Sequence, residues 1–223
     1  MNDLNPTRVL ITAGATQEPI DEVRYFGNRS SGKLGCLLAL AAAESGHTVT
    51  LLHSAQSLTP AAHPRLRCIS YTTTRDLAAK ADEHWPSHSI LIMAAAVSDF
   101  TPQGGQLQGK VKRRDELTIK CAPTDDIVAS LAANKREDQR IIAFALSEQE
   151  TLRTVALEKL EQKNVDAIVA NPLETMDSSL IDATVILRSG ETRSPIHAST
   201  KASFARWLIE NLDDITCPTS LRP

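Results

Sequence analysis

The sequence has no apolar run long enough to cross a membrane. Its most apolar windows, 37–43 and 90–97, are far shorter than the roughly 20 apolar residues that span a bilayer core. The amino-terminal segment MNDLNPTR has no apolar core of the kind that a secretory signal requires. These absences predict a cytoplasmic protein with no membrane partner.

The sequence also lacks a block of positive charge. Its 223 residues carry 24 Lys and Arg against 27 Asp and Glu, a formal charge of −3, and the basic residues are scattered. Proteins that bind nucleic acids usually gather basic side chains into a patch or stripe, so no nucleic-acid partner is expected. The length predicts a single domain, 1–223, that can bury a core and hold an active site.

Cysteine is scarce and isolated. No C-x-x-C pair and no histidine at ligand spacing accompanies the four cysteines, which are Cys36, Cys68, Cys121 and Cys217. This argues against a disulfide scaffold and a zinc site, and apolar surroundings predict that three of the thiols are buried. His84 and His88 have helical ligand spacing, but Pro86 breaks any helix between them, so a polar loop is expected there. The sequence leaves any metal ligands unknown.

Apolar runs rich in β-branched residues alternate with stretches of helix-forming residues. The apolar runs predict strands at 8–14, 47–54, 66–71, 89–99, 116–122, 140–146, 166–171 and 183–189. Helices are expected at 33–46, 73–84 (with Thr74 as N-cap), 125–134, 148–163 and 200–212. The alternation predicts a Rossmann-like three-layer α/β fold with a mostly parallel sheet and helices on both faces.

The predicted topology also predicts where a ligand binds. Ligands of such sheets bind outside the carboxyl ends of the strands, so one crevice should form from the loops that follow Thr12, Ala94, Phe144 and Ala170. Long polar loops at 15–32 and 99–116 are typical of functional or moving segments, and the second is expected to be a flexible flap. A disordered tail is expected at 213–223.

The segment GNRSSGKL, 27–34, fits G-x-x-x-x-G-K but lacks the rest of a phosphate-binding P-loop. Leu34 replaces the hydroxyl that ligates Mg²⁺, and charged residues just before Gly27 interrupt any buried strand. The start of the following helix could still bind an anion through free backbone N–H groups. The alternative is that Ser31 only caps the helix and Lys33 is solvated. TAGATQEP lacks the G-x-G-x-x-G fingerprint, which weakens a dehydrogenase interpretation.

Five segments, taken together, resemble the phosphopantothenoylcysteine synthetases. They lie in order along most of the chain at 10–35, 94–100, 109–114, 116–131 and 159–171. Many bacterial members of that family are fused behind a flavin-dependent decarboxylase. No such domain precedes this segment, so the resemblance implies a free-standing synthetase without flavin.

The resemblance implies a ligase of coenzyme A synthesis that joins 4′-phosphopantothenate to L-cysteine. In this family a nucleotide activates the carboxylate as an acyl-nucleotidyl phosphate, and the cysteine amine then displaces the nucleoside monophosphate. Cationic and amide donors, with Mg²⁺, would offset the charge that develops. CTP is the expected nucleotide, with ATP as the alternative. The resemblance also implies a homodimer with the flap reaching across, and a separate phosphopantothenoylcysteine decarboxylase as a further partner.

The resemblance implies catalytic and substrate-binding roles for a few polar residues. Asn28, in the N-x-S-S-G-K motif, could donate to the carbonyl of the acyl intermediate, although a turn residue is the alternative. Lys110 matches the catalytic flap lysine and Lys112 is expected at the substrate, but a solvated basic run is the alternative. Arg113 stands where the family has a third Lys. Asn171 fits the family's I-x-A-N motif, and its alternative role is a strand-end turn.

The resemblance further implies a nucleotide site assembled from separate segments. Its residues would be Gly14, Ser30, Ser31, Gly32, Lys33, Gly35, Ala94, Ala95, Ala96, Asp99, Lys110, Asp126, Ile127, Val128, Phe144, Lys159 and Lys163. Helix capping explains Asp126 about as well, and solvated side chains are the alternative for the two lysines of 148–163, which share one helix face. The run AFALSE, 143–148, departs from the family's G-F-A-A-E-T, which leaves the base open. A nucleotide-binding module without turnover and a Rossmann-like reductase are the other hypotheses.

Overall fold

A central sheet with helices on both faces organises the protein. The computed structural model describes residues 7–113, 117–175, 178–195 and 199–216. Within these residues the sheet has eight strands in the order β13-β12-β10-β9-β6-β1-β4-β5. The parallel strands are β1 (Arg8–Ala15), β4 (Thr48–Ser54), β5 (Leu66–Tyr71), β6 (Ile90–Ala96), β9 (Arg140–Ser147) and β10 (Ala167–Pro172). Two antiparallel strands, β12 (Thr184–Leu187) and β13 (Thr192–Arg193), extend one edge.

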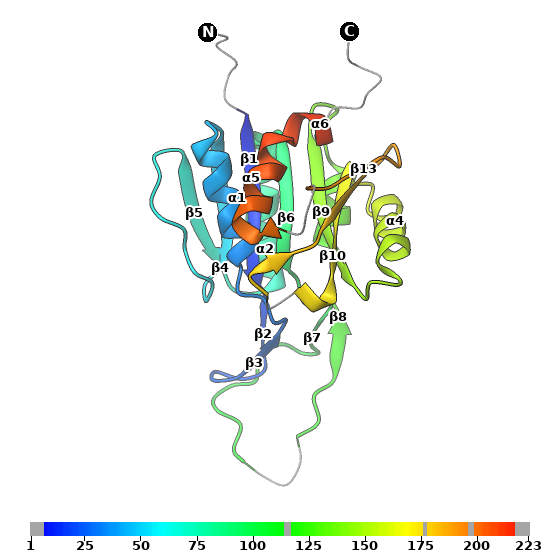
Figure 1. The fold of residues 1–223 in the computed structure, drawn as a ribbon. Helices are drawn as coiled ribbons and strands as arrows, with labels where there is room; N and C mark the ends of the chain where they lie inside the picture. The colour runs from blue at the N-terminus through cyan, green and yellow to red at the C-terminus, as the bar shows by residue number, and fades with distance from the viewer. Residues whose placement is uncertain (1–6, 114–116, 176–177, 196–198, 217–223) are drawn as a thin grey trace.

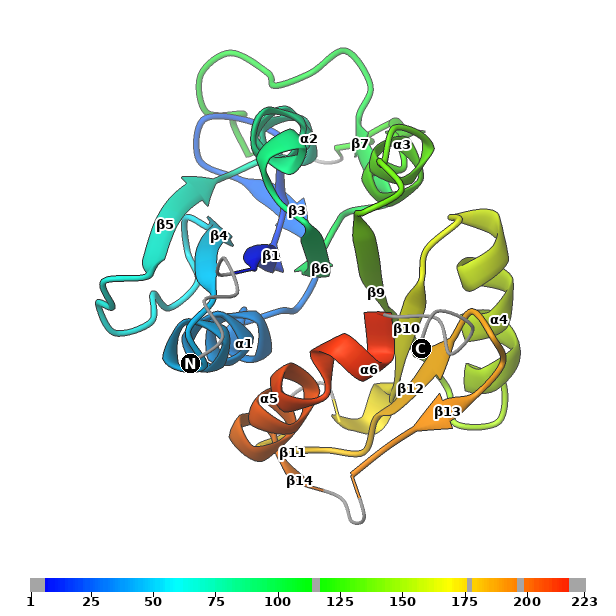
Figure 2. The ribbon, with the colours of Figure 1, turned by 90° about the horizontal axis from the view of Figure 1, so that it is seen from above.

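The six helices of the described residues form two layers (Figure 2). One face of the sheet packs against α1 (Lys33–Glu44), α5 (Lys201–Glu210) and α6 (Leu212–Thr216). The other face packs against α2 (Thr74–His84), α3 (Ile127–Ala133) and α4 (Leu152–Gln162). Alternate residues of β1 serve the two cores, because Val9 and Ile11 join the first and Leu10 joins the second. The predicted Rossmann-like three-layer fold is therefore confirmed.

The strand order reverses between β1 and β6. The chain runs outward from β1 to β4 and β5, then returns to β6 on the other side of β1 and continues to β9 and β10. Such a reversal opens a crevice at the carboxyl ends of the two strands, because the loops after them lead in opposite directions. The topology thus predicts the position of the site without reference to any side chain.

Short antiparallel pairs lie outside the main sheet. They are β2 (Gln17–Pro19) with β3 (Tyr25–Gly27), β7 (Phe100–Pro102) with β8 (Cys121–Pro123), and β11 (Leu180–Ile181) with β14 (Ser199–Thr200). Two 3-10 helices, η1 (Trp85–Ser87) and η2 (Leu173–Thr175), complete the described structure. The β2–β3 hairpin and the long loop between β7 and β8, at the bottom of Figure 1, extend beyond the sheet.

The structure corrects several expectations. The strand expected at 116–122 is wrong for the described residues, because among 117–123 only Cys121–Pro123 forms a strand, which pairs with β7, while Leu117 and Ile119 are exposed. Thr73 rather than Thr74 caps α2, since its side chain accepts from the Asp76 N–H at 3.1 Å.

The disordered tail expected at 213–223 is wrong at its start, because α6 continues to Thr216 and buries Leu212 and Ile215. Residues 217–223 of this tail and residues 114–116 of the expected flap lie outside the described residues. Cys36 is buried but Cys68 and Cys121 are exposed, so three buried thiols are not found, and Cys217 is not described. The polar loop expected around His84 and His88 contains the 3-10 helix Trp85–Ser87, and His88 is buried, with its Nε2 2.9 Å from the Thr50 hydroxyl. Within the described residues, no helix combines the length and apolarity that a membrane crossing requires.

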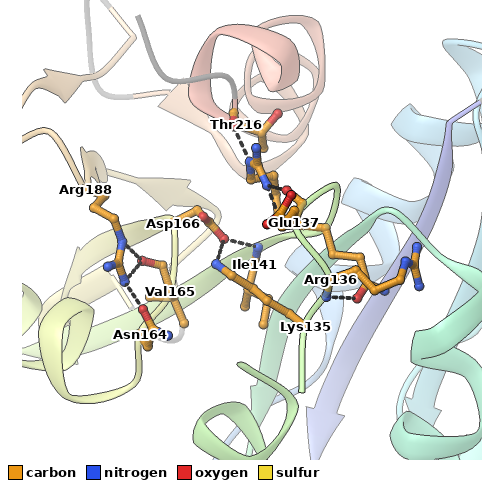
Figure 3. A network of polar contacts seen from close by, with 11 residues as sticks. Lys135, Arg136, Glu137, Ile141, Asn164, Val165, Asp166, Arg188 and Thr216 are labelled. Carbon is orange, nitrogen blue, oxygen red and sulfur yellow. Dashed lines mark hydrogen bonds and ion pairs between the residues drawn. The ribbon is translucent and has the colours of Figure 1, made fainter. Parts of the chain in front are cut away.

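A polar network fixes the amino ends of β9 and β10, at the edge of the sheet away from the crevice (Figure 3). The Asp166 carboxylate accepts from Lys135 Nζ at 2.6 Å and from the Ile141 N–H at 2.8 Å. Arg188 donates to the Val165 carbonyl at 2.9 and 3.0 Å. Arg140 Nε donates to the Thr216 carbonyl at 2.9 Å and ties the end of α6 to β9.

Candidate active site

A crevice of about 600 Å³ lies at the carboxyl ends of β6, β9 and β10, beside the amino end of α1. The expected convergence is confirmed, since the loop residues 28–32 that follow β1 line the crevice together with residues that follow Ala94, Phe144 and Ala170. Its lining comprises Asn28, Arg29, Ser30, Ser31, Gly32, Leu34, Gly35, Met93, Ala94, Ala95, Ala96, Val97, Asp99, Val128, Ala143, Phe144, Ala145, Leu146, Lys159, Lys163, Asn171 and Lys201. Its volume is within the usual range of small-molecule sites.

Backbone geometry at the start of α1 suits an anion. Gly32, the N-cap, has φ of 74° and ψ of 1°, and no side chain caps the helix. The Lys33 N–H donates a long hydrogen bond of 3.4 Å to the Ser31 hydroxyl, so the alternative that Ser31 caps the helix has partial support, while the N–H groups of Leu34 and Gly35 have no acceptor among the described residues. Free first-turn amides and the helix dipole favour a negative group at this position. Lys33 itself is exposed and does not line the crevice.

Two glycines let the chain pack tightly beneath this turn. A Cβ on Gly32 would lie 2.8 Å from the Ser57 Cβ and 3.0 Å from the Gly14 nitrogen. Gly14, expected in the nucleotide site, does not line the crevice and supports the turn from below. The buried Tyr71 hydroxyl lies 2.8 Å from the Ala13 carbonyl oxygen and 2.9 Å from that of Gly14. Burial raises the pKa of Tyr71, so this hydroxyl stays a neutral donor.

Asn28 lies where the loop after β3 meets the end of β6. Its Nδ2 donates to the Val97 carbonyl at 2.9 Å, and because a carbonyl only accepts, this contact fixes the orientation of the amide. Asn28 and Ser30 line both the crevice and an adjoining polar chamber of about 200 Å³. The amide is therefore held in place at the junction of two cavities, with a second N–H left to donate.

Two lysines from α4 and its C-cap position supply positive charge to the crevice. Lys159 and Lys163 are half-buried and both line it, as their spacing on one helix face predicts. Burial lowers the pKa of Lys159, the neighbouring Lys163 lowers it further, and Asp99 and Asp126 act in the opposite direction. Because two ammonium groups lie close together in a partly buried place, an anion bound between them would be favoured.

Asp126 has structural partners that explain it without a ligand. Its Oδ1 accepts from the Ala129 N–H at 3.0 Å, which caps α3, and its Oδ2 lies 3.0 Å from Lys163 Nζ. Burial by itself would raise the pKa of Asp126, but these partners bring it below its ordinary value. Asp126 and Ile127 line an adjoining pocket of about 190 Å³ and not the main crevice, whereas Val128 lines both.

The structure does not bring Lys110 and Lys112 to the crevice. Both are exposed on the loop between β7 and β8, and neither lines the cavity. This part of the loop lies against the turn at 20–24, where Val111 contacts Asp21 and Arg24. Of the expected site residues, the crevice therefore leaves out Gly14, Lys33, Lys110, Lys112, Asp126 and Ile127 and gathers the others.

The sequence offers little signal for one crevice residue, Lys201, and for Thr12, which supports the crevice without lining it. Lys201, the first residue of α5, is buried with 9% of its surface exposed and lines the crevice. The helix dipole disfavours a lysine at the first position of a helix, and this is the only feature of the sequence that marks Lys201 as unusual. Thr12, hidden in an apolar strand, accepts from the Ala95 N–H at 3.0 Å and holds the small-residue segment after Met93.

No metal cluster accompanies the crevice in the part of the chain that the structure describes. There, no group of three or more His, Cys, Asp or Glu side chains could hold a metal ion. Asp99 is the acidic residue of the crevice lining, and Lys159, Lys163 and Lys201 share that lining with it. The crevice thus presents cations, amides and free N–H groups, a donor set suited to an anionic ligand.

The fold and this crevice define a Rossmann-like α/β protein with an anion-suited ligand site at the strand ends. The family model of the DNA/pantothenate metabolism flavoprotein C-terminal domain matches residues 4–215. The chain belongs to this family.

Named relatives agree with that membership. The coenzyme A biosynthesis bifunctional protein CoaBC of Escherichia coli K12 is 38% identical over 149 residues, which are 65% of this chain and 36% of that protein. The chain thus spans about a third of the length of such relatives. The crystal structure of the DNA/pantothenate metabolism flavoprotein from Streptococcus pneumoniae superposes with a TM-score of 0.81 at 25% identity, covering 93% of this chain and 99% of that one. The C-terminal domain of a CoaBC gives a TM-score of 0.78 at 29% identity, with 96% and 98% covered.

Proposed function

We propose that the protein is a phosphopantothenate–cysteine ligase of coenzyme A biosynthesis that acts through an acyl-nucleotidyl intermediate. In the first step a carboxylate oxygen of 4′-phosphopantothenate attacks the α-phosphorus of the nucleotide, and pyrophosphate leaves. In the second, the amine of L-cysteine attacks the acyl carbon and loses a proton, the new amide bond forms, and the nucleoside monophosphate leaves. The likeness to CoaBC supports this choice of substrates.

One observation carries the proposal: an oriented amide, free helix-start amides and two lysines line a single crevice. Asn28 is fixed by its contact with Val97 and retains a second N–H for the acyl carbonyl. Lys159 and Lys163 would bind phosphate oxygens, and the first turn of α1 would add backbone N–H groups. Neutral and cationic donors aimed at developing negative charge are what an attack between two anions requires.

Mg²⁺ enters this proposal as part of the nucleotide substrate. Among the described residues no set of three metal-ligating side chains is gathered, so the phosphates would supply most of its ligands. Asp99 is the acidic residue of the crevice lining and could supply a remaining ligand to Mg²⁺. Lys110 and Lys112 would join the site from a second copy of the chain.

We further propose CTP as the nucleotide, with ATP as the competing choice. Phe144 lines the crevice together with the small residues Ala94, Ala95 and Ala96, so a base would have an aromatic ring to stack on and small side chains beside it. Leu146 of the divergent run AFALSE also lines the crevice, so this run would frame the base. A pyrimidine needs less room than a purine in such a slot.

The test is pyrophosphate release by purified protein with Mg²⁺, 4′-phosphopantothenate and L-cysteine, with CTP and ATP compared. Release that requires phosphopantothenate and proceeds with CTP supports the ligase and its base. Preference for ATP would overturn the choice of base alone, and release with neither would overturn the ligase. In Asn28→Ala, kcat should fall about 100-fold through loss of a transition-state donor. A normal kcat in this variant would remove Asn28 from the chemistry.

A further inference from the structure

A buried carboxylate organises the tip of the β2–β3 hairpin. Asp21 is 3% exposed, although it lies in a short turn between two small strands. Its Oδ1 accepts from the N–H groups of Val23 at 2.8 Å and Arg24 at 2.7 Å, which closes the turn. This part of the contact set is local, and Asp commonly makes it in turns.

The second oxygen of the same carboxylate reaches the flap. Asp21 Oδ2 accepts from the Val111 N–H at 3.0 Å and from Arg24 Nη1 at 2.6 Å. Arg24 Nη1 also lies 3.3 Å from the Val111 carbonyl oxygen. Both backbone groups of Val111 are therefore held, one by the carboxylate and one by the guanidinium that the carboxylate orients.

Further backbone contacts align the flap with the hairpin. The Leu107 N–H donates to the Ile20 carbonyl at 3.0 Å, and the Glu22 N–H lies 3.5 Å from the Gly109 carbonyl oxygen. In Figure 1 the loop after β7 passes beside the β2–β3 hairpin. The segment 107–111 thus runs along the turn, and Asp21 is its side-chain contact at the point where Lys110 and Lys112 flank Val111.

The ionised form of Asp21 strengthens its hydrogen bonds to the hairpin turn and to the flap. Burial would raise its pKa, but the N–H groups of Val23, Val111 and Arg24 and the charge of Arg24 outweigh that effect and lower it. The carboxylate is therefore ionised throughout the neutral range. Hydrogen bonds to an ionised acceptor are roughly twice as strong as those between neutral groups.

We propose that Asp21 is a positioning residue for the flap, which through the Val111 amide determines where Lys110 and Lys112 stand. We call the contacts of Asp21 and Arg24 with Val111 the clamp. The same hairpin continues through β3 into Asn28, whose side-chain amide donates to the Val97 carbonyl. Only a few residues of chain therefore separate the clamp from the crevice. Its effect on turnover rests on the proposed ligase function, while the clamp itself does not.

Amide hydrogen exchange of the full chain without nucleotide tests the clamp. Asp21→Asn replaces one acceptor oxygen of the carboxylate by an NH2 group, which donates and cannot accept. In this variant the Val111 amide hydrogen should exchange about tenfold faster than in the unaltered protein. Glu22→Gln, which changes an exposed acid in the same turn, should leave that rate unchanged. Equal Val111 exchange in Asp21→Asn and the unaltered protein would overturn the proposal.

A second variant covers the case in which Asp21→Asn does not fold. Val111→Pro removes the donated N–H and leaves Asp21 in place. Trypsin should then cleave after Lys112 several-fold faster than in the unaltered protein, as expected for a released loop. Cleavage at the unaltered rate in this variant would contradict the clamp.

A double-mutant cycle distinguishes positioning of the flap lysine from a general structural effect. If Asp21 acts through Lys110, Asp21→Asn should lower kcat for pyrophosphate release about tenfold alone and less than about twofold in the Lys110→Ala background. Equal losses in both backgrounds would overturn the positioning role. If the unaltered protein releases no pyrophosphate, the ligase proposal fails, and the exchange experiment still decides the clamp.

Discussion

At the scale of single residues, the crevice depends as much on missing side chains as on those present. Gly35 lies where α1 crosses the end of β1, and a Cβ there would be 2.5 Å from the Ala13 Cβ and 2.9 Å from the Thr12 carbonyl oxygen. Real Cβ atoms do not approach so closely, so α1 would have to move away from the sheet. The helix start that is proposed to bind phosphate would move with it.

Gly35→Ala is therefore expected to destabilise the protein by roughly 1–3 kcal/mol through overpacking, and to weaken nucleotide binding. Denaturant unfolding and CTP titration would measure the two effects. The control is Gly190→Ala, where a Cβ meets nothing within 4 Å and only the positive φ of 85° is strained. CTP binding should be unchanged in this control. Normal stability of Gly35→Ala would show that α1 does not pack as tightly as described.

Lys159 gives the crevice a pH dependence of known sign. Because the pKa of Lys159 is lowered, mainly by burial, its charge is lost at a lower pH than in an ordinary lysine. A bound triphosphate would raise that pKa again, so affinity should be full below the lowered pKa and fall as the pH rises through it. CTP affinity measured across the alkaline range should show this fall, which should be absent in Lys159→Met. Lys80→Met, far away on α2 and paired with Asp76, should retain it.

At the scale of elements, the two ends of the sheet have different tasks. The carboxyl ends of β6, β9 and β10 carry the crevice, and the amino ends of β9 and β10 carry the network of Figure 3. Asp166 is central to this network, because its carboxylate accepts from Lys135 Nζ and from the N–H of Ile141, near the start of β9. Both side chains of the pair are only 17% exposed, so neither is well solvated if its partner is removed.

Asp166→Ala should therefore cost roughly 2–3 kcal/mol of unfolding free energy, because it leaves an ammonium and a backbone N–H without their acceptor. The matched control is Asp138→Ala, which removes an exposed partner of Arg136 and should leave stability unchanged. Chemical denaturation of both variants would provide the comparison. Similar losses in the two would mean that the Asp166 contacts contribute no more than a surface ion pair.

At the scale of the whole molecule, the hairpin and flap present apolar side chains to solvent. The exposed ones there are Val23, Tyr25, Phe100, Leu107, Leu117 and Ile119. An apolar surface of this kind usually marks an interaction site. We propose a second copy of the chain as its occupant, which would place the flap lysines of one copy near the crevice of the other. We also propose a separate phosphopantothenoylcysteine decarboxylase as a further partner, because the relative CoaBC named above is a bifunctional protein.

Light scattering at micromolar concentration should thus give the mass of a dimer, about twice 24.2 kDa. Val23→Asp with Phe100→Asp should give a monomer, because charges would be buried in the interface. A monomer from the unaltered protein would contradict the proposed dimer. Retention of dimer by the double variant would move the interface elsewhere.

The sequence by itself determined the layered fold, most element positions and the edge of the sheet that carries the site. Apolar periodicity is local, and parallel strands joined by helices can form only a few topologies. Family resemblance added residues such as Asn28, Phe144, Lys159 and Lys163, all of which line the crevice.

Tertiary structure alone decided which residues meet at the crevice and at the flap. It placed Gly14 beneath the α1 turn, paired Asp126 with Lys163, kept Lys110 and Lys112 outside the crevice, and brought Lys201 into it. It also joined Asp21 to Val111, ninety residues apart in the chain. Such contacts depend on how loops and helices pack in space, and no local pattern of residues encodes that packing.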